Sequence, residues 1–164
     1  MQTESRILWP PNYDPTNCPI HVRNQLEIPG PPETVWAWLI RAQLWPKWYP
    51  NSANILFLSG KPPDLASGTR FRWKTFGVTV ESTVLEFMPF ERLGWDARRS
   101  GFDAYHAWLI QKNERGCYVL TEEVQRGSLA RLSRILRPSH MEEKHQLWLE
   151  RLSAQAIGGL PPPP

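Results

Sequence analysis

Residues 104–125 read AYHAWLIQKNERGCYVLTEEVQ and predict two β-strands joined by a short loop. Residues 104–111 and residues 117–125 both have the length and the apolar, aromatic and β-branched content of strands. The loop between them, residues 112–116, ends in Gly116, as hairpin loops of this length commonly do. The stretch therefore predicts an antiparallel hairpin, and the rest of the fold can be built outward from it.

Other strands precede this hairpin and are separated from one another by short links. The clearest is residues 68–76, where Phe71, Trp73 and Thr75 share one face and basic residues occupy the other. Consecutive strands with short links favour an antiparallel meander. Seven strands are predicted: residues 20–28, 55–58, 68–76, 78–87, 93–97, 104–111 and 117–125.

Two short helices are predicted between the first strand and the second. The first begins at Pro32 and Glu33, because the fixed φ of proline and an acidic side chain both suit a first helical turn. The second spans residues 42–48 and is interrupted by Pro46.

A long helix is predicted after the last strand, over residues 129–156, with Ser128 as its N-cap. Pro138 should kink or split it. A twisted antiparallel sheet curls, so this helix can pack across the concave face and leave a cavity where the two diverge. Past the proline, one helix face collects Met141, His145, Trp148 and Leu152.

Several short motifs follow one another in a recognisable order. They are PETVW at 32–36, WPKW at 45–48, GTRF at 68–71, VLEFMP at 84–89, LGW at 93–95, HAWL at 106–109 and GCYV at 116–119. Their order and spacing resemble those of the START-like superfamily, also called SRPBCC, and in particular its bacterial polyketide cyclase/dehydrase-like branch.

The resemblance covers residues 20–156 and implies an α+β helix-grip fold. In that fold a curved antiparallel sheet of about seven strands surrounds a long C-terminal helix. The resemblance also implies an internal cavity for a ligand. It implies no single reaction, because members of the superfamily bind lipids, hormones and polyketides and many are not enzymes.

The hairpin brings together a candidate acid/base pair. If Trp73 and its neighbours face the interior, the equivalent alternation on the last two strands turns His106, Trp108, Thr121 and Glu123 inward. A tight hairpin then sets His106 opposite Glu123, and Trp108 opposite Thr121. A histidine beside a carboxylate in an apolar cavity suits general acid/base catalysis. The alternative is a buried hydrogen bond that satisfies both groups and has no further role.

Nine tryptophans are many for 164 residues, and they should line a cavity or cover an interface. An aromatic cavity would suit flat or ring-bearing ligands. His145 is either a satisfied core residue or a contact to the ligand from the helix side. The candidate ligand-binding side chains are Trp36, Trp48, Phe71, Trp73, Trp95, Trp108, Thr121, Met141, His145 and Trp148.

Charge and cysteine content narrow the function further. The net charge of +3 is mild and the chain lacks the clustered basic patch that nucleic-acid binding needs. Cys18 and Cys117 are not spaced like the cysteines of a metal or redox site. The histidine, aspartate and glutamate residues also form no cluster with metal-ligand spacing, so neither a metal nor a cofactor is expected. No signal peptide and no apolar run of about 20 residues is visible, which predicts a cytoplasmic protein.

The basic amphipathic segment at Arg131, Arg134 and Arg137 is either a solvated helix face or a contact to a membrane surface or acidic headgroup. The predicted organisation is an irregular N-terminal arm at 1–19, the domain at 20–157, and a disordered proline-rich tail at 158–164. The arm could seal the cavity or pair with a second copy in a homodimer.

Three functions remain open at this point. The first is binding of a small hydrophobic or aromatic, lipid- or polyketide-like ligand. The second is a polyketide cyclase/dehydratase-type reaction with His106 and Glu123 as acid and base, although no nucleophile, cofactor loop or oxyanion motif is visible. The third is an interaction module whose own tryptophans fill the cavity.

Overall fold

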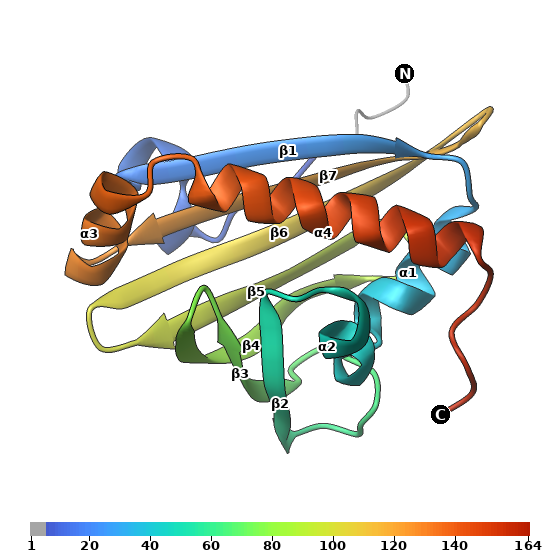
Figure 1. Cartoon of the computed structure of the whole chain (residues 1–164), viewed down its shortest axis with the longest axis horizontal. Helices are drawn as coiled ribbons and strands as arrows, with labels where there is room; N and C mark the ends of the chain where they lie inside the picture. Colours follow the sequence, from blue (N-terminus) through green and yellow to red (C-terminus); the bar gives the residue numbers. More distant parts are fainter. Residues whose placement is uncertain (1–5) are drawn as a thin grey trace.

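The computed structural model describes residues 6–164 and contains one seven-stranded antiparallel sheet that curves around a long helix (Figure 1). Its strands lie in the order β1-β7-β6-β5-β4-β3-β2, so β1 and β7 are neighbours although they lie far apart in the sequence. The predicted helix-grip arrangement is confirmed. The strands are β1 Ile20–Ile28, β2 Ser52–Ser59, β3 Arg70–Thr75, β4 Val78–Met88, β5 Arg92–Arg99, β6 Phe102–Asn113 and β7 Gly116–Arg126.

The two short helices between β1 and β2 begin where the prolines predict. The first, α1 (Pro32–Ile40), has Pro32 in its first turn and Glu33 beside it. The second region is a 3-10 turn, Ala42–Leu44, followed directly by α2 (Trp45–Trp48). Pro46 stands in the first turn of α2 and therefore does not break a hydrogen-bonded helix.

The last helical region is split at Pro138, as expected, into α3 (Ser128–Leu136) and α4 (His140–Ile157). The predicted N-cap is wrong by one position, because Gly127 precedes the helix and Ser128 is its first residue. Gly127 has φ of +110°, and a Cβ there would lie 2.3 Å from the carbonyl oxygen of Gly101. Only glycine fits this junction without displacing the backbone.

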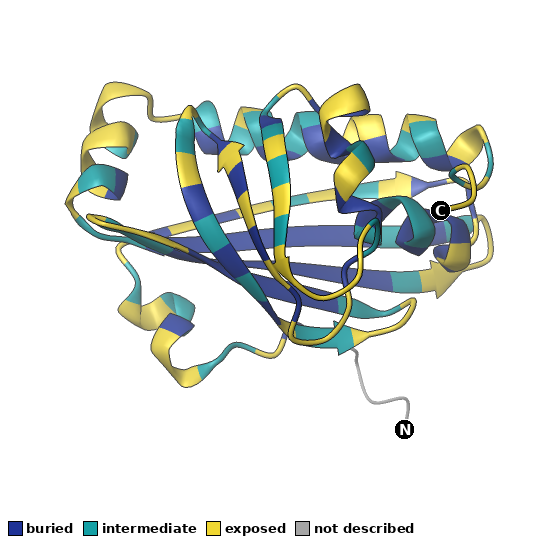
Figure 2. Cartoon of the chain, turned by 90° about the horizontal axis from the view of Figure 1, so that it is seen from below, coloured by how far each residue is buried: buried dark blue, intermediate teal, exposed yellow. Residues whose placement is uncertain are grey.

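The long helix α4 lies across the concave face of the sheet, in contact with β1 and with α1 and α2 (Figure 1). Its inward stripe includes His145, Trp148 and Leu152, which are completely or almost completely buried. Figure 2 shows buried positions concentrated along the long strands next to α4. The core therefore lies between this helix and β3 to β7.

The N-terminal arm lies on the opposite, outer face of the sheet. It contains two short 3-10 turns, Pro11–Tyr13 and Pro15–Asn17. Ile7 and Tyr13 pack against side chains of β6 and β7, and the Tyr13 ring stacks on Tyr105 with centroids 5.3 Å apart. Residues 6–19 of the arm therefore do not seal the interior, whereas pairing of the arm with a second copy stays a prediction.

The segment after α4 has defined contacts with α1. The indole N–H of Trp38 donates to the carbonyl oxygen of Gly159 at 2.7 Å, and the Arg41 guanidinium donates to that of Pro162. The division into arm, domain and disordered tail stays a prediction, although these contacts give residues 159 and 162 definite positions. Within residues 6–164, no helix combines the length and the apolar character that crossing a membrane would need.

Candidate functional site

The hairpin of β6 and β7 places the candidate acid/base pair as its register predicts. His106 pairs with Glu123 across the strands, and Trp108 pairs with Thr121. Both His106 and Glu123 are buried, at 3% and 5% exposure. Alternation along each strand turns these side chains toward α4, while Tyr105 and Ala107, on either side of His106, face the N-terminal arm.

A second histidine reaches the same carboxylate from α4. Nε2 of His145 lies 2.9 Å from Oε2 of Glu123, and Nδ1 of His106 lies 3.5 Å from that same oxygen. The two imidazole rings stack with centroids 4.7 Å apart. The sequence places His145 on the inward stripe of the helix but does not show that it meets Glu123.

Two further polar side chains of β7 hold this group in place. Oγ1 of Thr121 lies 2.6 Å from Nε2 of His106, and Nε2 of Gln125 donates to Oε1 of Glu123 at 2.6 Å. Gln125 is absent from the predicted site. The sequence does indicate Gln125, because it follows Glu123 by two positions, as Glu123 follows Thr121, so that all three side chains share one face of the strand.

Burial decides the protonation of His106. It lowers the pKa of this imidazole to about 3, against the opposing charge of Glu123 and with a smaller contribution from His145. Burial also raises the pKa of Glu123, but its hydrogen bond from His145, the two neighbouring imidazoles and Gln125 hold that pKa below its usual value. At neutral pH, a neutral His106 therefore faces an ionised Glu123.

A cluster of aromatic rings fills the interior next to these polar groups. Trp148 of α4 is its centre and stacks on Tyr49, with ring centroids 4.3 Å apart. The other rings around Trp148 have centroids 5.1 to 6.1 Å away: Trp108, Trp45, His106, Trp73 and Trp95.

Several indole N–H groups in this interior lack a hydrogen-bond partner among the described residues. They are those of Trp48, Trp95, Trp108 and Trp148. Two neighbouring tryptophans differ, because Trp45 donates to the carbonyl oxygen of Leu39 and Trp73 donates to Oγ of Ser82, both at 3.0 Å. Buried polar atoms are normally paired, so these unpaired donors distinguish the interior from an ordinary aromatic core.

The sequence was compared with models of known protein families. The model of a family described as polyketide cyclase/dehydrase and lipid transport matches residues 19–160.

The chain belongs to this family.

Solved structures agree with the assignment to the polyketide cyclase/dehydrase and lipid transport family, within the START-like superfamily. The hypothetical protein jhp0584 from Helicobacter pylori is 32% identical, with a TM-score of 0.86 over 95% of this chain and 99% of that one. The di-domain ARO/CYC StfQ from the steffimycin biosynthetic pathway is 13% identical, with a TM-score of 0.69 over 84% of this chain and 50% of that one.

Ara h 8.0201 is 11% identical, with a TM-score of 0.65 over 85% of this chain and 99% of that one. The likeness to StfQ and to Ara h 8.0201 shows the fold alone. No curated protein matches the chain.

In this member of the family, three donors from separate elements could hold a metal ion. One ligand atom each from His106, Glu123 and His145 lie within 4.8 Å of one another. Two imidazoles and a carboxylate are a set that divalent zinc or iron can bind. The prediction that no such cluster exists was drawn from spacing along the chain, which cannot show donors that meet only after folding.

Of the other predicted ligand contacts, Met141 lies apart, in a separate apolar cluster with β1. Trp36 belongs to the main core cluster and packs on Phe87 and Phe90. Phe71, Trp73, Trp95, Trp108 and Trp148 do gather in one cluster, and Trp48 reaches it through Tyr49. Trp45 and Tyr49 belong to this cluster and are absent from the predicted site, since the short helix that positions them has no periodic pattern.

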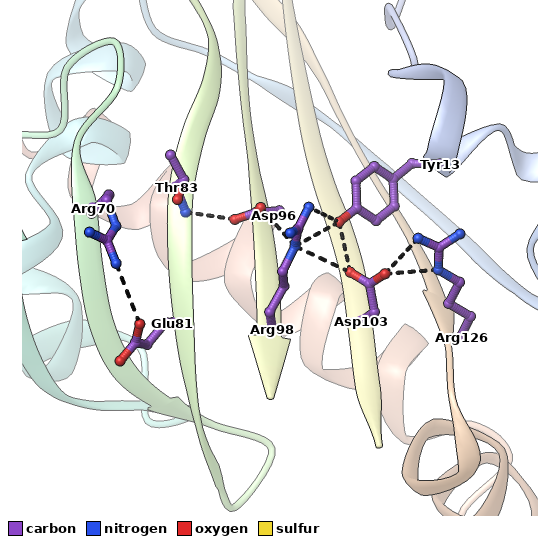
Figure 3. A network of polar contacts seen from close by, with 8 residues as sticks. All are labelled: Tyr13, Arg70, Glu81, Thr83, Asp96, Arg98, Asp103 and Arg126. Carbon is purple, nitrogen blue, oxygen red and sulfur yellow. Dashed lines mark hydrogen bonds and ion pairs between the residues drawn. The ribbon is translucent and has the colours of Figure 1, made fainter. Parts of the chain in front are cut away.

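The internal cavity that the family resemblance implies is not shown, because the rings of the interior contact one another. The hollows that the structure describes lie outside this cluster. One of about 520 Å³ lies on the outer face between β3, β4 and β5. Figure 3 shows the polar network beside it, in which Asp96 accepts from the Thr83 amide and Asp103 joins Tyr13 to Arg126.

Proposed function

We propose that this chain binds a small, flat, largely apolar molecule with hydrogen-bond acceptors, in the interior between α4 and the sheet. The observation that supports the proposal is the set of buried indole N–H groups without partners, at Trp48, Trp95, Trp108 and Trp148. Leaving a buried donor unpaired costs about 1–3 kcal/mol. A carbonyl or hydroxyl oxygen of a bound molecule would satisfy such donors.

The surrounding rings match the rest of such a ligand. Flat ring systems gain from stacking and edge contacts with Trp95 and Trp108, which lie on neighbouring strands, and with Trp148, which approaches them from α4. Because these rings touch, binding requires them to separate, either by rotation of Trp148 or by a shift of α4 away from the sheet. Polyketide-like or lipid-like molecules with an aromatic or carbonyl-bearing portion fit this description.

Binding is favoured over catalysis by the pKa of His106. A general base works best with a pKa near the operating pH, and a pKa of about 3 leaves the His106 imidazole too weak a base for that role. A cyclase or dehydratase remains the second candidate, because the His106–Glu123–His145 group is buried, hydrogen-bonded and adjacent to the aromatic cluster. In that reaction Glu123, which is ionised, would accept the proton, but its lowered pKa makes it a weak base as well.

Native mass spectrometry of the freshly purified chain, followed by denaturing extraction, tests for a bound molecule directly. A stoichiometric ring compound or acyl lipid is expected. If nothing is bound, a panel of aromatic and acyl ligands is screened by thermal shift. No co-purified molecule and no shift across the panel would leave only the interaction module, with its own tryptophans as a closed core.

Two matched substitutions then test the role of the indole donors. Trp108→Phe keeps a ring and removes an unpaired donor, whereas Trp73→Phe removes a donor already bonded to Ser82. We expect Trp108→Phe to weaken ligand binding about tenfold, the worth of one hydrogen bond to a ligand acceptor. Equal losses in both variants would indicate ring packing alone and would contradict the proposal.

A further inference from the structure

The helix α3 (Ser128–Leu136) presents its apolar side chains to solvent. Leu132 is 53% exposed, Leu136 is 70% exposed, and Ile135, at 77%, is the most exposed large hydrophobic side chain of the described residues. Within α3 only Ala130 is buried. Figure 2 shows this helix as almost entirely exposed at one end of the molecule.

The orientation of α3 is the reverse of that of an ordinary surface helix. At about 100° per residue, Leu132, Ile135 and Leu136 fall within one third of the helix circumference. Ala130, which faces the domain, lies about 160° from Leu132 around the helix. The apolar stripe therefore points away from the protein, and soluble proteins rarely leave such a stripe uncovered.

The charged side chains of α3 and of the residue that follows it are all basic. The helix contains no acidic residue, and Arg131, Arg134 and the following Arg137 recur every three positions. Arg134 pairs with Glu142 of α4 at 2.7 Å. Arg131 and Arg137 are exposed, and neither forms an ion pair within the part of the chain that the structure describes. Nearby, burial lowers the pKa of His140, and Lys144 and Arg137 lower it further, against the opposing charge of Glu143.

We propose that α3 docks on an anionic lipid surface. Leu132, Ile135 and Leu136 would enter the boundary between headgroups and acyl chains, and Arg131 and Arg137 would meet lipid phosphates. An apolar stripe on a short helix whose charged residues are all arginines is the composition of helices that lie in a membrane interface. Each basic side chain near such a surface adds to the attraction. With only three apolar side chains the contact is weak and reversible, and it needs both the apolar and the basic groups.

Docking would bring one end of the interior close to the lipid. Phe76, in the turn between β3 and β4, packs edge-on against both His140 at the start of α4 and His145, with ring centroids 5.6 and 6.1 Å apart. The half-buried Phe76 therefore links the α3 end of the molecule to His145 of the His106–Glu123–His145 group. The docking itself does not depend on the function proposed above.

Flotation of the full chain with lipid vesicles tests the proposal. We expect binding to vesicles of phosphatidylcholine with phosphatidylglycerol, a decrease as salt rises, and little binding to phosphatidylcholine alone. The triple variant Leu132→Ser, Ile135→Ser, Leu136→Ser should bind at least about tenfold more weakly, and so should Arg131→Gln with Arg137→Gln. Leu85→Ser, at an exposed leucine of β4, is the matched control and should bind like the unchanged chain.

Circular dichroism shows whether each variant keeps its fold, which is expected because every substituted side chain is exposed. Equal binding to both kinds of vesicle, or none to either, would overturn the proposal. Sedimentation velocity distinguishes docking on lipid from docking on a second copy of the chain. A dimer that dissociates in the triple variant would show that α3 docks on a second copy and would overturn the proposal.

Discussion

At the scale of single residues, the group formed by His106, Glu123 and His145 makes stability depend on pH. The folded state keeps His106 neutral down to a pKa of about 3, whereas the unfolded chain takes up a proton near the ordinary value of 6.5. Between these values the unfolded state binds more protons, so the free energy of unfolding falls as pH falls. The lowered pKa of Glu123 acts in the same direction below about pH 4.5.

Urea unfolding between pH 7 and pH 4 checks this dependence. The expected slope is up to about 1.4 kcal/mol per pH unit for His106 alone. His106→Gln should reduce stability at pH 7 but flatten the slope, because the titrating imidazole is gone. A slope that the substitution leaves unchanged would show that other groups govern the acid sensitivity.

The junction before α3 offers a second test at this scale. Gly127→Ala introduces a Cβ that would meet the Gly101 carbonyl oxygen at 2.3 Å, at a residue with φ of +110°. Gly77→Ala is the control, since Gly77 also has a positive φ but no atom within 4 Å of the added Cβ. We expect a loss of about 1 kcal/mol at Gly77 and clearly more at Gly127, measured by chemical denaturation. Equal losses would show that conformation, and not the contact with Gly101, sets the cost.

At the scale of secondary-structure elements, the described part of the N-terminal arm packs on the outer face of β6 and β7, opposite the face that carries α4. Tyr13 donates to Asp103 at 2.7 Å, stacks on Tyr105, and lies under the Arg126 guanidinium. We expect Tyr13→Phe to cost about 1 kcal/mol and Tyr13→Ala about 3 kcal/mol in unfolding free energy. Ligand uptake should stay unchanged in both variants, and its loss in Tyr13→Phe would tie the arm to the interior.

The elements and their register could be predicted because local rules determine them. All seven strands occur where alternation and turn residues predict, and the short hairpin loop fixes His106 opposite Glu123. The rotation and position of α4 could not be predicted, because they depend on the break at Pro138 and on packing with α1 and α2. The sequence therefore places His145 on the inward face of the helix but cannot show that its partner is Glu123.

At the scale of the whole molecule, the sequence does not predict which side chains meet in the interior. Nine tryptophans predict an aromatic interior, but whether an indole is paired depends on distant backbone or side-chain atoms, as in the bond from Trp45 to Leu39. The gathering of Trp148 with Tyr49 depends on how a four-residue helix meets α4. These contacts arise only when the layers close, and no local pattern encodes them.

The pairing of β1 with β7 has a consequence for the order in which the chain folds during synthesis. The ribosome delivers β1 first among the strands, and its one partner in the sheet is the strand delivered last. Until β7 emerges, β1 has no partner for its backbone, and α4, which packs on β1, follows later still. Nascent chains that stop before β7 should therefore stay unfolded, and the domain should close only after β7 and α4 have been synthesised.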